Sequence, residues 1–175
     1  SQYLMDTIVE ISATSQSKNV GRQIDSVFNF IRSLEDKLNE YDPNSYLGKI
    51  NADSLNTVFD MDPDMYNLLT IADSLFKMTN GAFDPTIKPV WDLWNFNAEN
   101  PVPPDSLVLK EMLSKVDFTK IRYDEKRLIK PLGMQLTFGA IAKGYILDKA
   151  RDHMQTLNLD NGYINCRSSM TFFGY

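Results

Sequence analysis

Hydrophobic positions recur at helical spacing in several segments of the chain. Apolar residues return every three or four positions from Val20 to about Glu40, which predicts a long amphipathic helix. A second helix is predicted from Pro63 to Met78, with Asn80-Gly81 ending it as a C-cap. A short helix is predicted at Ser106–Leu113, and a further amphipathic helix extends from Ile141 to Leu157.

Other apolar segments have the length and alternation of strands. The segment from Tyr3 to Ala13 contains several β-branched residues and is predicted to form one strand. Shorter strands are predicted further along the chain, joined by charged turns, and they are Ile121–Tyr123, Leu128–Ile129, Gln135–Phe138, Tyr163–Cys166 and Met170–Phe173.

Three segments are predicted to lie outside regular structure. Tyr46–Asn51 is interpreted as a polar connector, and Gly81–Trp94 is interrupted by proline although it is rich in aromatic residues. Asp160-Asn161-Gly162 is predicted to be a hairpin-like turn. The strands that cluster before Phe138 argue against a parallel βαβ series. We therefore predict an α+β (mixed α/β) fold in which helices pack on a mostly antiparallel sheet, in a single domain spanning residues 1–175.

Composition narrows the classes of function. The 175 residues are 43% hydrophobic, which excludes a disordered chain, and the net charge is −5. No basic run with interleaved aromatics is present, so nucleic acid is not expected as a partner. The single cysteine, Cys166, is expected in the core and the single histidine, His153, on the surface. These counts exclude the usual Cys/His catalysts and zinc sites.

The stretch Leu136–Asp148 carries the most informative local pattern. An apolar run meets the small residues Gly139 and Ala140, and Lys143 follows in the first turn of the predicted helix. Exposed N–H groups at a helix start suit an anion, and bare carbonyl groups suit a hard cation. Small residues also let a helix pack closely on a sheet. From these residues alone, a phosphate site, a metal site and simple packing remain alternatives.

Four segments, in this order and spacing, resemble the FAD:protein FMN transferase family, also called ApbE-like flavin transferases. The resemblance covers nearly the whole chain. The segments are Met5-Asp6-Thr7, then Tyr41–Ser45 with Asn51, then Gly81–Thr86 leading to Leu93-Trp94, and finally Gly139–Tyr145 with Asp148.

This resemblance implies a transferase that uses FAD as its substrate. Members of the family move FMN from FAD onto a threonine hydroxyl of a partner protein, with Mg2+, and release AMP. Some members instead hydrolyse FAD to FMN and AMP, so an FAD pyrophosphatase is one alternative. A non-catalytic flavin-binding or interaction module is the other. Phosphoryl transfer depends on positioning and charge neutralisation, so a chain without a catalytic histidine or cysteine is compatible with it.

The resemblance also implies roles for particular positions. Tyr41 is expected to stack on the flavin, Lys143 to meet the phosphates or ribose of FAD, and the carbonyl of Ala140 to bind Mg2+. Asp84 is expected to bond a nucleotide group, although an Asx-turn before Pro85 is a second interpretation of it. Asn51 is a weaker pocket candidate. The full set of expected cofactor-binding residues is Met5, Tyr41, Ala82, Phe83, Asp84, Thr137 and Lys143, with Ala140 for the metal.

Three residues depart from the family pattern. Asp6 stands where the family has glycine, Thr137 where it has aspartate, and Arg167 where it has glycine. Members of the family are also longer, and the residues that complete the Mg2+ site and activate the acceptor are expected in a later segment. No catalytic residue is therefore expected within this chain, which is expected to be a truncated and inactive portion. The family is typically periplasmic or otherwise extracytoplasmic, with membrane association only through an N-terminal lipid anchor.

Overall fold

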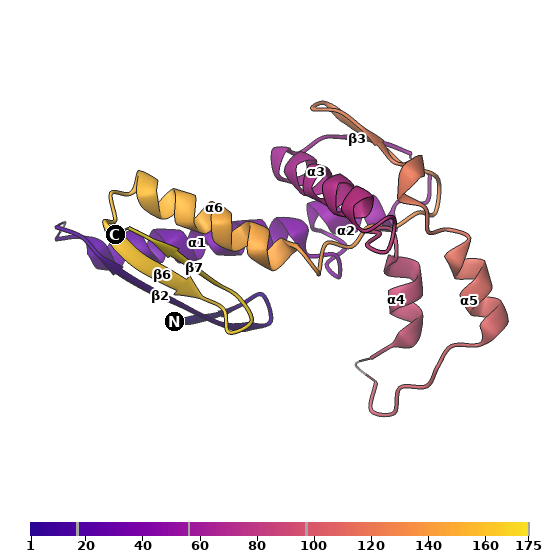
Figure 1. Cartoon of the computed structure of the whole chain (residues 1–175), viewed down its shortest axis with the longest axis horizontal. Coiled ribbons are helices and arrows are strands. Elements are labelled where there is room, and N and C mark those ends of the chain that lie inside the picture. Colours follow the sequence, from indigo (N-terminus) through magenta and orange to yellow (C-terminus); the bar gives the residue numbers. More distant parts are fainter. Residues whose placement is uncertain (17, 56, 97, 175) are drawn as a thin grey trace. The chain divides into compact units, whose positions relative to one another are not determined.

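The chain folds into two compact units, and Figure 1 shows their helices and strands. The structure is a computed structural model that describes residues 1–16, 18–55, 57–96 and 98–174. The first unit comprises residues 1–39 and 139–175, and the second comprises residues 40–138.

The first unit is a four-stranded antiparallel sheet with two helices. The strands are β1 (Gln2–Leu4), β2 (Thr7–Thr14), β6 (Asn161–Asn165) and β7 (Met170–Phe173), in the order β1-β2-β6-β7. Helices α1 (Val20–Leu38) and α6 (Ala142–Thr156) lie side by side and pack against the sheet (Figure 1). Buried apolar residues of both helices, with Val9 and Ile164 from the sheet, form the core of this unit.

A tight hairpin divides the segment that was predicted to be one strand. Leu4 pairs with Thr7, and the two residues between them, Met5 and Asp6, have φ angles of 53° and 57°. Positive φ at both central positions is the type I′ turn, which matches the twist of paired strands. The prediction of a single strand from Tyr3 to Ala13 is therefore wrong. A glycine at position 6 would have indicated the turn in the sequence, but the chain has Asp6 there.

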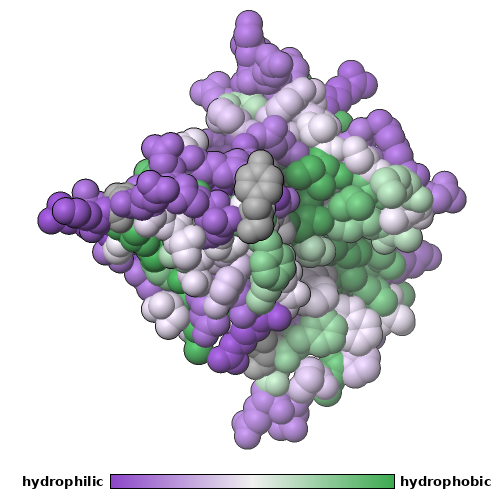
Figure 2. Space-filling model, turned by 60° about the vertical axis from the view of Figure 1, so that its left-hand side comes forward, coloured by the Kyte–Doolittle hydropathy of each residue, from purple (hydrophilic) through white to green (hydrophobic). Residues whose placement is uncertain are grey.

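The outer face of this sheet carries exposed aromatic residues. Tyr3 and Phe172 are 69% and 67% exposed, and Phe172 is the cross-strand partner of Tyr163. The rings of Tyr163 and Phe172 lie 6.4 Å apart. Figure 2 shows hydrophobic residues at the surface in patches between hydrophilic ones. The solvent-exposed face of this sheet is therefore partly aromatic, whereas such faces are commonly polar.

The second unit combines four helices with a small antiparallel sheet. The sheet has the order β3-β5-β4. Together with a 3-10 turn, η1 (Phe118–Lys120), the elements are α2 (Tyr46–Ala52), β3 (Val58–Asp60), α3 (Pro63–Met78), α4 (Lys88–Trp94), α5 (Ser106–Leu113), β4 (Arg122–Tyr123) and β5 (Arg127–Ile129). Among the described residues, no helix of either unit is long and apolar enough to cross a membrane.

Two helices of this unit lie in segments that were predicted to be irregular. Helix α2 begins after Ser45, whose hydroxyl accepts a hydrogen bond from the Gly48 N–H at 2.7 Å. Gly48 is required there because a Cβ would collide with the Asp42 carbonyl oxygen. Helix α4 tolerates Pro89 because proline lies in its first turn, where the backbone N–H has no partner within the helix.

Other predicted elements have mixed outcomes. Helices α1, α3, α5 and α6 are confirmed, and the left-handed residues Asn80 and Gly81 end α3 as predicted. Asn161 and Gly162 belong to β6, so the predicted turn at 160–162 is wrong. Cys166 is buried as predicted. His153 is half-buried, and its ring stacks on Phe30 at 4.6 Å, so the prediction of a surface residue holds only in part.

The segment 134–138 is extended without being a strand. Met134, Leu136 and Phe138 are buried and alternate with more exposed residues, as the sequence pattern predicts. No strand pairs with them among the described residues. The Thr137 N–H instead donates to the carbonyl of Pro85 at 2.8 Å, and Leu136 is bound by the side chain of Asn51. The alternating sequence pattern therefore predicted the buried positions correctly, but the predicted strand at Gln135–Phe138 is wrong.

Candidate functional site

The start of helix α6, in the first unit, has backbone N–H groups without a side-chain cap. Its N-cap residue is Ile141, whose side chain cannot accept a hydrogen bond, and its first turn contains no acidic residue. Gly139 and Ala140 before it are exposed. The positive end of the helix dipole is therefore accompanied by uncapped donors, an arrangement that favours an anion such as phosphate.

Lys143 lies in this first turn and is half-buried. Its ammonium group forms no hydrogen bond or ion pair that the structure records among the described residues. A lysine without an internal partner at a helix start adds a full positive charge to the partial charge of the helix end. The Lys143 charge and the helix start together suit a phosphate group, either of a nucleotide or of free phosphate.

Ala140 offers little to a metal ion by itself. Mg2+ takes six oxygen ligands in near-octahedral geometry, usually with one or two carboxylates and with phosphate or water for the remainder. Within the described ranges, no three His, Cys, Asp or Glu side chains gather as a metal-binding group. The carbonyl of Ala140 is one neutral oxygen. The described residues therefore do not make a Mg2+ site on their own.

Met5, the other candidate in the first unit, is the first residue of the β1–β2 turn. Its side chain is buried, and its backbone N–H donates to the Glu35 Oε1 at 2.7 Å. Glu35 belongs to helix α1. The turn is therefore held in place by a carboxylate from the neighbouring helix, a partner that the sequence analysis missed.

Tyr41 is an exposed aromatic candidate in the second unit. Its residue surface is 67% exposed, and the Lys88 Nζ lies over its ring, 4.6 Å from the centroid. Partial burial and the charge of Glu40 raise the pKa of the Tyr41 hydroxyl, while the charge of Lys88 opposes them. Tyr41 is thus an accessible aromatic ring with a cation on one face.

Lys88 itself is nearly buried and is bound by two acids. Its Nζ lies 3.0 Å from both carboxylate oxygens of Asp92 and 3.5 Å from the Glu40 Oε1. Burial alone would lower the pKa of Lys88, but the bond to Asp92 and the charge of Glu40 hold it above its ordinary value. Lys88 was not predicted from the sequence. Its spacing of four residues from Asp92 was the available signal.

Asp84 has a structural role. Its Oδ1 accepts hydrogen bonds from the Thr86 N–H at 2.7 Å and hydroxyl at 2.6 Å, and its Oδ2 accepts from the Phe118 N–H at 3.1 Å. The Thr86 Oγ1 in turn accepts from the Asp117 N–H at 2.9 Å. The Asx-turn interpretation is therefore confirmed. A carboxylate has about four acceptor positions, so at most one remains for a ligand.

Of the remaining candidates of the second unit, Ala82 and Phe83 precede this turn in sequence, and Thr137 is bonded to Pro85. Ala82 is exposed, Phe83 and Thr137 are half-buried, and the Phe83 N–H donates to the Thr79 hydroxyl at 2.9 Å. Asn51 is buried, and its amide both donates to and accepts from the backbone of Leu136. Asn51 thus supports the segment that contains Thr137, and its expected contact with a ligand in the pocket remains a prediction.

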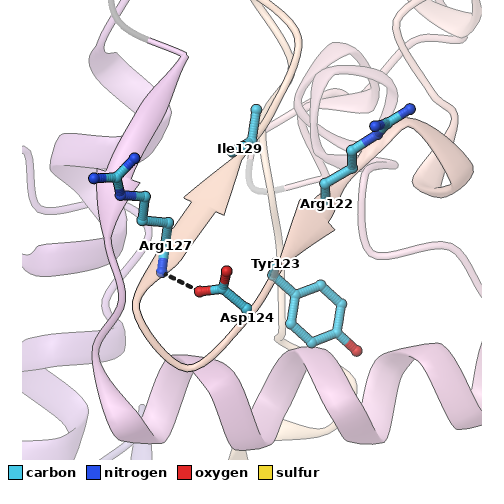
Figure 3. A pocket seen from close by; sticks show the side chains of 5 residues that line it. All are labelled: Arg122, Tyr123, Asp124, Arg127 and Ile129. Carbon is cyan, nitrogen blue, oxygen red and sulfur yellow. Dashed lines mark hydrogen bonds between the residues drawn. The ribbon is translucent and has the colours of Figure 1, made fainter.

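A shallow hollow of about 260 Å³ lies at the β4–β5 hairpin. Figure 3 shows its lining, with the Arg127 N–H donating to the Asp124 Oδ1 at 2.8 Å. Two backbone hydrogen bonds lower the pKa of Asp124, so its carboxylate serves the turn. None of the residues predicted from the sequence lines this hollow. Its residues are Arg122, Tyr123, Asp124, Arg127 and Ile129.

Comparison with known proteins identifies relatives over most of the chain. Residues 5–174 match the ApbE family. The FAD:protein FMN transferase of Treponema pallidum is 26% identical over 174 residues, which are 95% of this chain and 48% of that protein. The enzyme of the same name from Haemophilus influenzae is 28% identical over 161 residues, or 86% of this chain and 45% of that protein. The chain thus spans about half the length of these relatives.

Solved structures share the fold. The ApbE protein from Thermotoga maritima superposes with a TM-score of 0.86 at 27% identity, covering 98% of this chain and 57% of that one. The flavin transferase ApbE from Vibrio cholerae gives a TM-score of 0.87 at 20% identity, covering 95% of this chain and 56% of that one. At that identity the second likeness concerns the fold alone. The predicted α+β fold with antiparallel sheets is confirmed.

Proposed function

The chain belongs to the ApbE family, and on that basis we propose that it acts as an FAD:protein FMN transferase. The proposed reaction moves FMN from FAD onto a threonine hydroxyl of a partner protein, in the presence of Mg2+, and releases AMP. The observation that carries the proposal is the family match across residues 5–174, supported by relatives that bear this name. Those relatives are about twice as long as this chain. The transferase activity of the whole protein is therefore a proposal.

The first unit supports a phosphate-binding role. We assign Lys143 and the uncapped N–H groups of α6 to the phosphates of FAD, because both are positive and neither is neutralised by an acid in the first turn. The pyrophosphate carries the charge that such groups stabilise. In phosphoryl transfer, this positioning and neutralisation of charge supply most of the catalysis.

The second unit supports a flavin-binding role. We assign Tyr41 to the isoalloxazine ring, because it is an aromatic residue that is 67% exposed and has a cation over one face of its ring. Ala82, Phe83, Asp84 and Thr137 remain proposed contacts of FAD, as does Met5 in the first unit. The single unused acceptor position of Asp84 is compatible with one bond to the nucleotide.

Mg2+ is part of the proposal through the resemblance to the family. When bound, it would neutralise charge on the phosphate oxygens of FAD, and the carbonyl of Ala140 would supply one ligand. The described residues do not complete the coordination of the ion. The expected extracytoplasmic location and the expected single domain both stay predictions.

The test is a transfer reaction followed by mass spectrometry. The protein is incubated with FAD, Mg2+ and a partner protein that carries the acceptor threonine, and AMP is measured in the same samples. Transferase activity predicts release of AMP together with an increase in the mass of the partner by one FMN group. The partner with threonine replaced by valine is the control. AMP without flavinylation would assign the FAD pyrophosphatase activity instead, and absence of both products would exclude catalysis by this chain.

A further inference from the structure

Lys88 binds Tyr41 and two acids at once, and all four residues belong to the second unit. Its ammonium group lies 3.0 Å from the Asp92 oxygens, 3.5 Å from the Glu40 Oε1 and 4.6 Å from the centroid of the Tyr41 ring. Its side chain is only 6% exposed. A buried ammonium group is costly unless it is paired, so these contacts determine where the Lys88 Nζ lies.

The two acids anchor the cation from different places in the sequence. Asp92 is one turn further along α4 than Lys88, and Glu40 directly precedes Tyr41 in the chain. The ion pair with Glu40 therefore ties the backbone next to Tyr41 to the start of α4. The face of the Tyr41 ring lies against the Lys88 ammonium group, which is itself fixed by Asp92 and Glu40.

We propose that Lys88 is a positioning residue that fixes the ring of Tyr41 as one wall of a flavin subsite. The inference rests on the proposed function, in which Tyr41 stacks on the isoalloxazine ring. Because the ammonium group occupies one face of the ring, an aromatic ligand can stack only on the opposite face. Tyr41 as a whole remains 67% exposed, which leaves surface for such a ligand.

The expected contribution is one of preorganisation. An unrestrained tyrosine loses side-chain freedom when a ligand stacks on it, and that loss weakens binding. Lys88 removes this freedom before the ligand arrives. Loss of its charge should therefore weaken binding of any ligand that contains the flavin ring by about 2- to 10-fold. A ligand that lacks the flavin ring should be unaffected.

The test compares ligands and variants in the intact chain. FAD, FMN and AMP are titrated into the wild type, Lys88→Met, Lys88→Arg and Tyr41→Ala, with Lys77→Met as the matched control. Lys77 also forms an i,i+4 ion pair with an aspartate, but on the exposed surface of α3. Lys88→Met leaves the nearly buried carboxylate of Glu40 without its cation. The double variant Lys88→Met/Glu40→Gln is therefore measured as well.

We expect Lys88→Met and the double variant to bind FAD and FMN more weakly than the wild type does, and to bind AMP equally well. Lys88→Arg, which keeps the charge, should bind both flavins as the wild type does. A second readout needs no ligand. The ultraviolet titration of Tyr41, identified by its loss in Tyr41→Phe, should shift to higher pH in Lys88→Met, because the charge of Lys88 lowers the pKa of that hydroxyl. Lys77→Met should change neither measurement.

The outcomes separate this inference from the proposed function. If Tyr41→Ala weakens the binding of FAD but Lys88→Met and the double variant do not, the inference is overturned and the proposed function stands. Equal weakening of AMP in the Lys88 variants would indicate a general effect on the fold and would also overturn it. If the wild type binds neither FAD nor FMN at high micromolar concentration, both the inference and the flavin site of this chain are excluded.

Discussion

The side chain of Asn51 pairs with the backbone of Leu136 in both directions. The Asn51 Nδ2 donates to the Leu136 carbonyl at 2.8 Å, and the Leu136 N–H donates to the Asn51 Oδ1 at 2.8 Å. Both residues are buried. One amide side chain thus takes the place of a neighbouring strand and satisfies the backbone of an extended segment that has no strand partner there.

We therefore predict that Asn51→Ala destabilises the protein by about 2–4 kcal/mol, because one buried donor and one buried acceptor lose their partners. Urea denaturation followed by circular dichroism measures the change in the free energy of unfolding. Asn100→Ala, at an exposed loop position, is the control and should change stability by less than about 0.5 kcal/mol. Equal stability of Asn51→Ala and wild type would show that the pairing contributes nothing.

This pairing also marks where prediction from the sequence reached its limit. The periodicity of long helices, such as α1 and α3, sufficed because their apolar stripes are wide and their ends carry clear signals. Helix α2 was missed because it is seven residues long, too short for a periodic pattern. Alternating burial in 134–138 was predictable, but no pattern in the sequence could indicate that an asparagine more than 80 residues away replaces a strand.

The candidate residues were predictable to a similar degree. Motifs located the start of α6 and the exposed ring of Tyr41, because glycine, lysine and tyrosine carry recognisable chemistry. The partners of these residues were not predictable. Glu35, which bonds the backbone of Met5, and Lys88, which covers one face of Tyr41, are distant in sequence and become neighbours only through the fold. Supporting residues therefore require the structure.

Replacing Asp6 by glycine should stabilise the β1–β2 hairpin. Met5 and Asp6 both have positive φ, and glycine adopts that conformation without the steric cost that a Cβ imposes. Part of the gain is offset by the greater freedom of glycine in the unfolded chain. We expect an increase of about 0.5–1 kcal/mol, or about 1–4 °C in the melting temperature. Differential scanning calorimetry measures it.

The matched variant at the same position is Asp6→Val. A β-branched residue is poorly compatible with positive φ, so this variant should lose about 1 kcal/mol or more. If valine and glycine gave the same stability, backbone conformation at this position would not be the determinant, and the turn would have to be rearranged in solution.

Replacing Lys130 by methionine should also stabilise the protein. Lys130 is 1% exposed, and its Nζ has no hydrogen-bond partner among the described residues, although it lies 5.4 Å from the ring centroid of Phe59. An unsatisfied buried polar group costs about 1–3 kcal/mol, and methionine retains most of the volume of the side chain. We expect Lys130→Met to gain stability of that order at pH 7 in urea denaturation.

The same residue should make stability depend on pH. Burial lowers the pKa of Lys130, with the charge of Asp53 as a smaller opposing effect. Between the folded pKa and the unfolded value near 10.5, the unfolded state binds more protons, so the stability of the wild type should rise as pH increases through that window. Lys130→Met should lack this rise. The exposed Lys110→Met is the control, and if it flattened the profile equally, Lys130 would not be its source.

Lys143→Ala should weaken FAD binding without unfolding the protein. Lys143 makes no ion pair within the described residues, so its removal should change the free energy of unfolding by less than about 0.5 kcal/mol. A charged hydrogen bond to phosphate contributes about 1.5–3 kcal/mol, so the dissociation constant of FAD should rise about 10-fold or more. Quenching of flavin fluorescence measures the affinity for FAD and FMN, and calorimetry measures the affinity for ADP.

The matched control is Lys149→Ala, which removes the same charge from the same helix. Lys149 lies beyond the first turn of α6, and its Nζ is 5.5 Å from the ring centroid of Tyr145. Because the field of a helix end decays within one turn, this variant should bind FAD nearly as well as the wild type. The effect of Lys143→Ala should also shrink as salt is raised, since salt screens charges that are in contact with solvent. Unchanged affinity in Lys143→Ala, with ADP and FAD alike, would assign Lys143 to the solvated surface and leave the uncapped N–H groups of α6 as the remaining candidates for the phosphates.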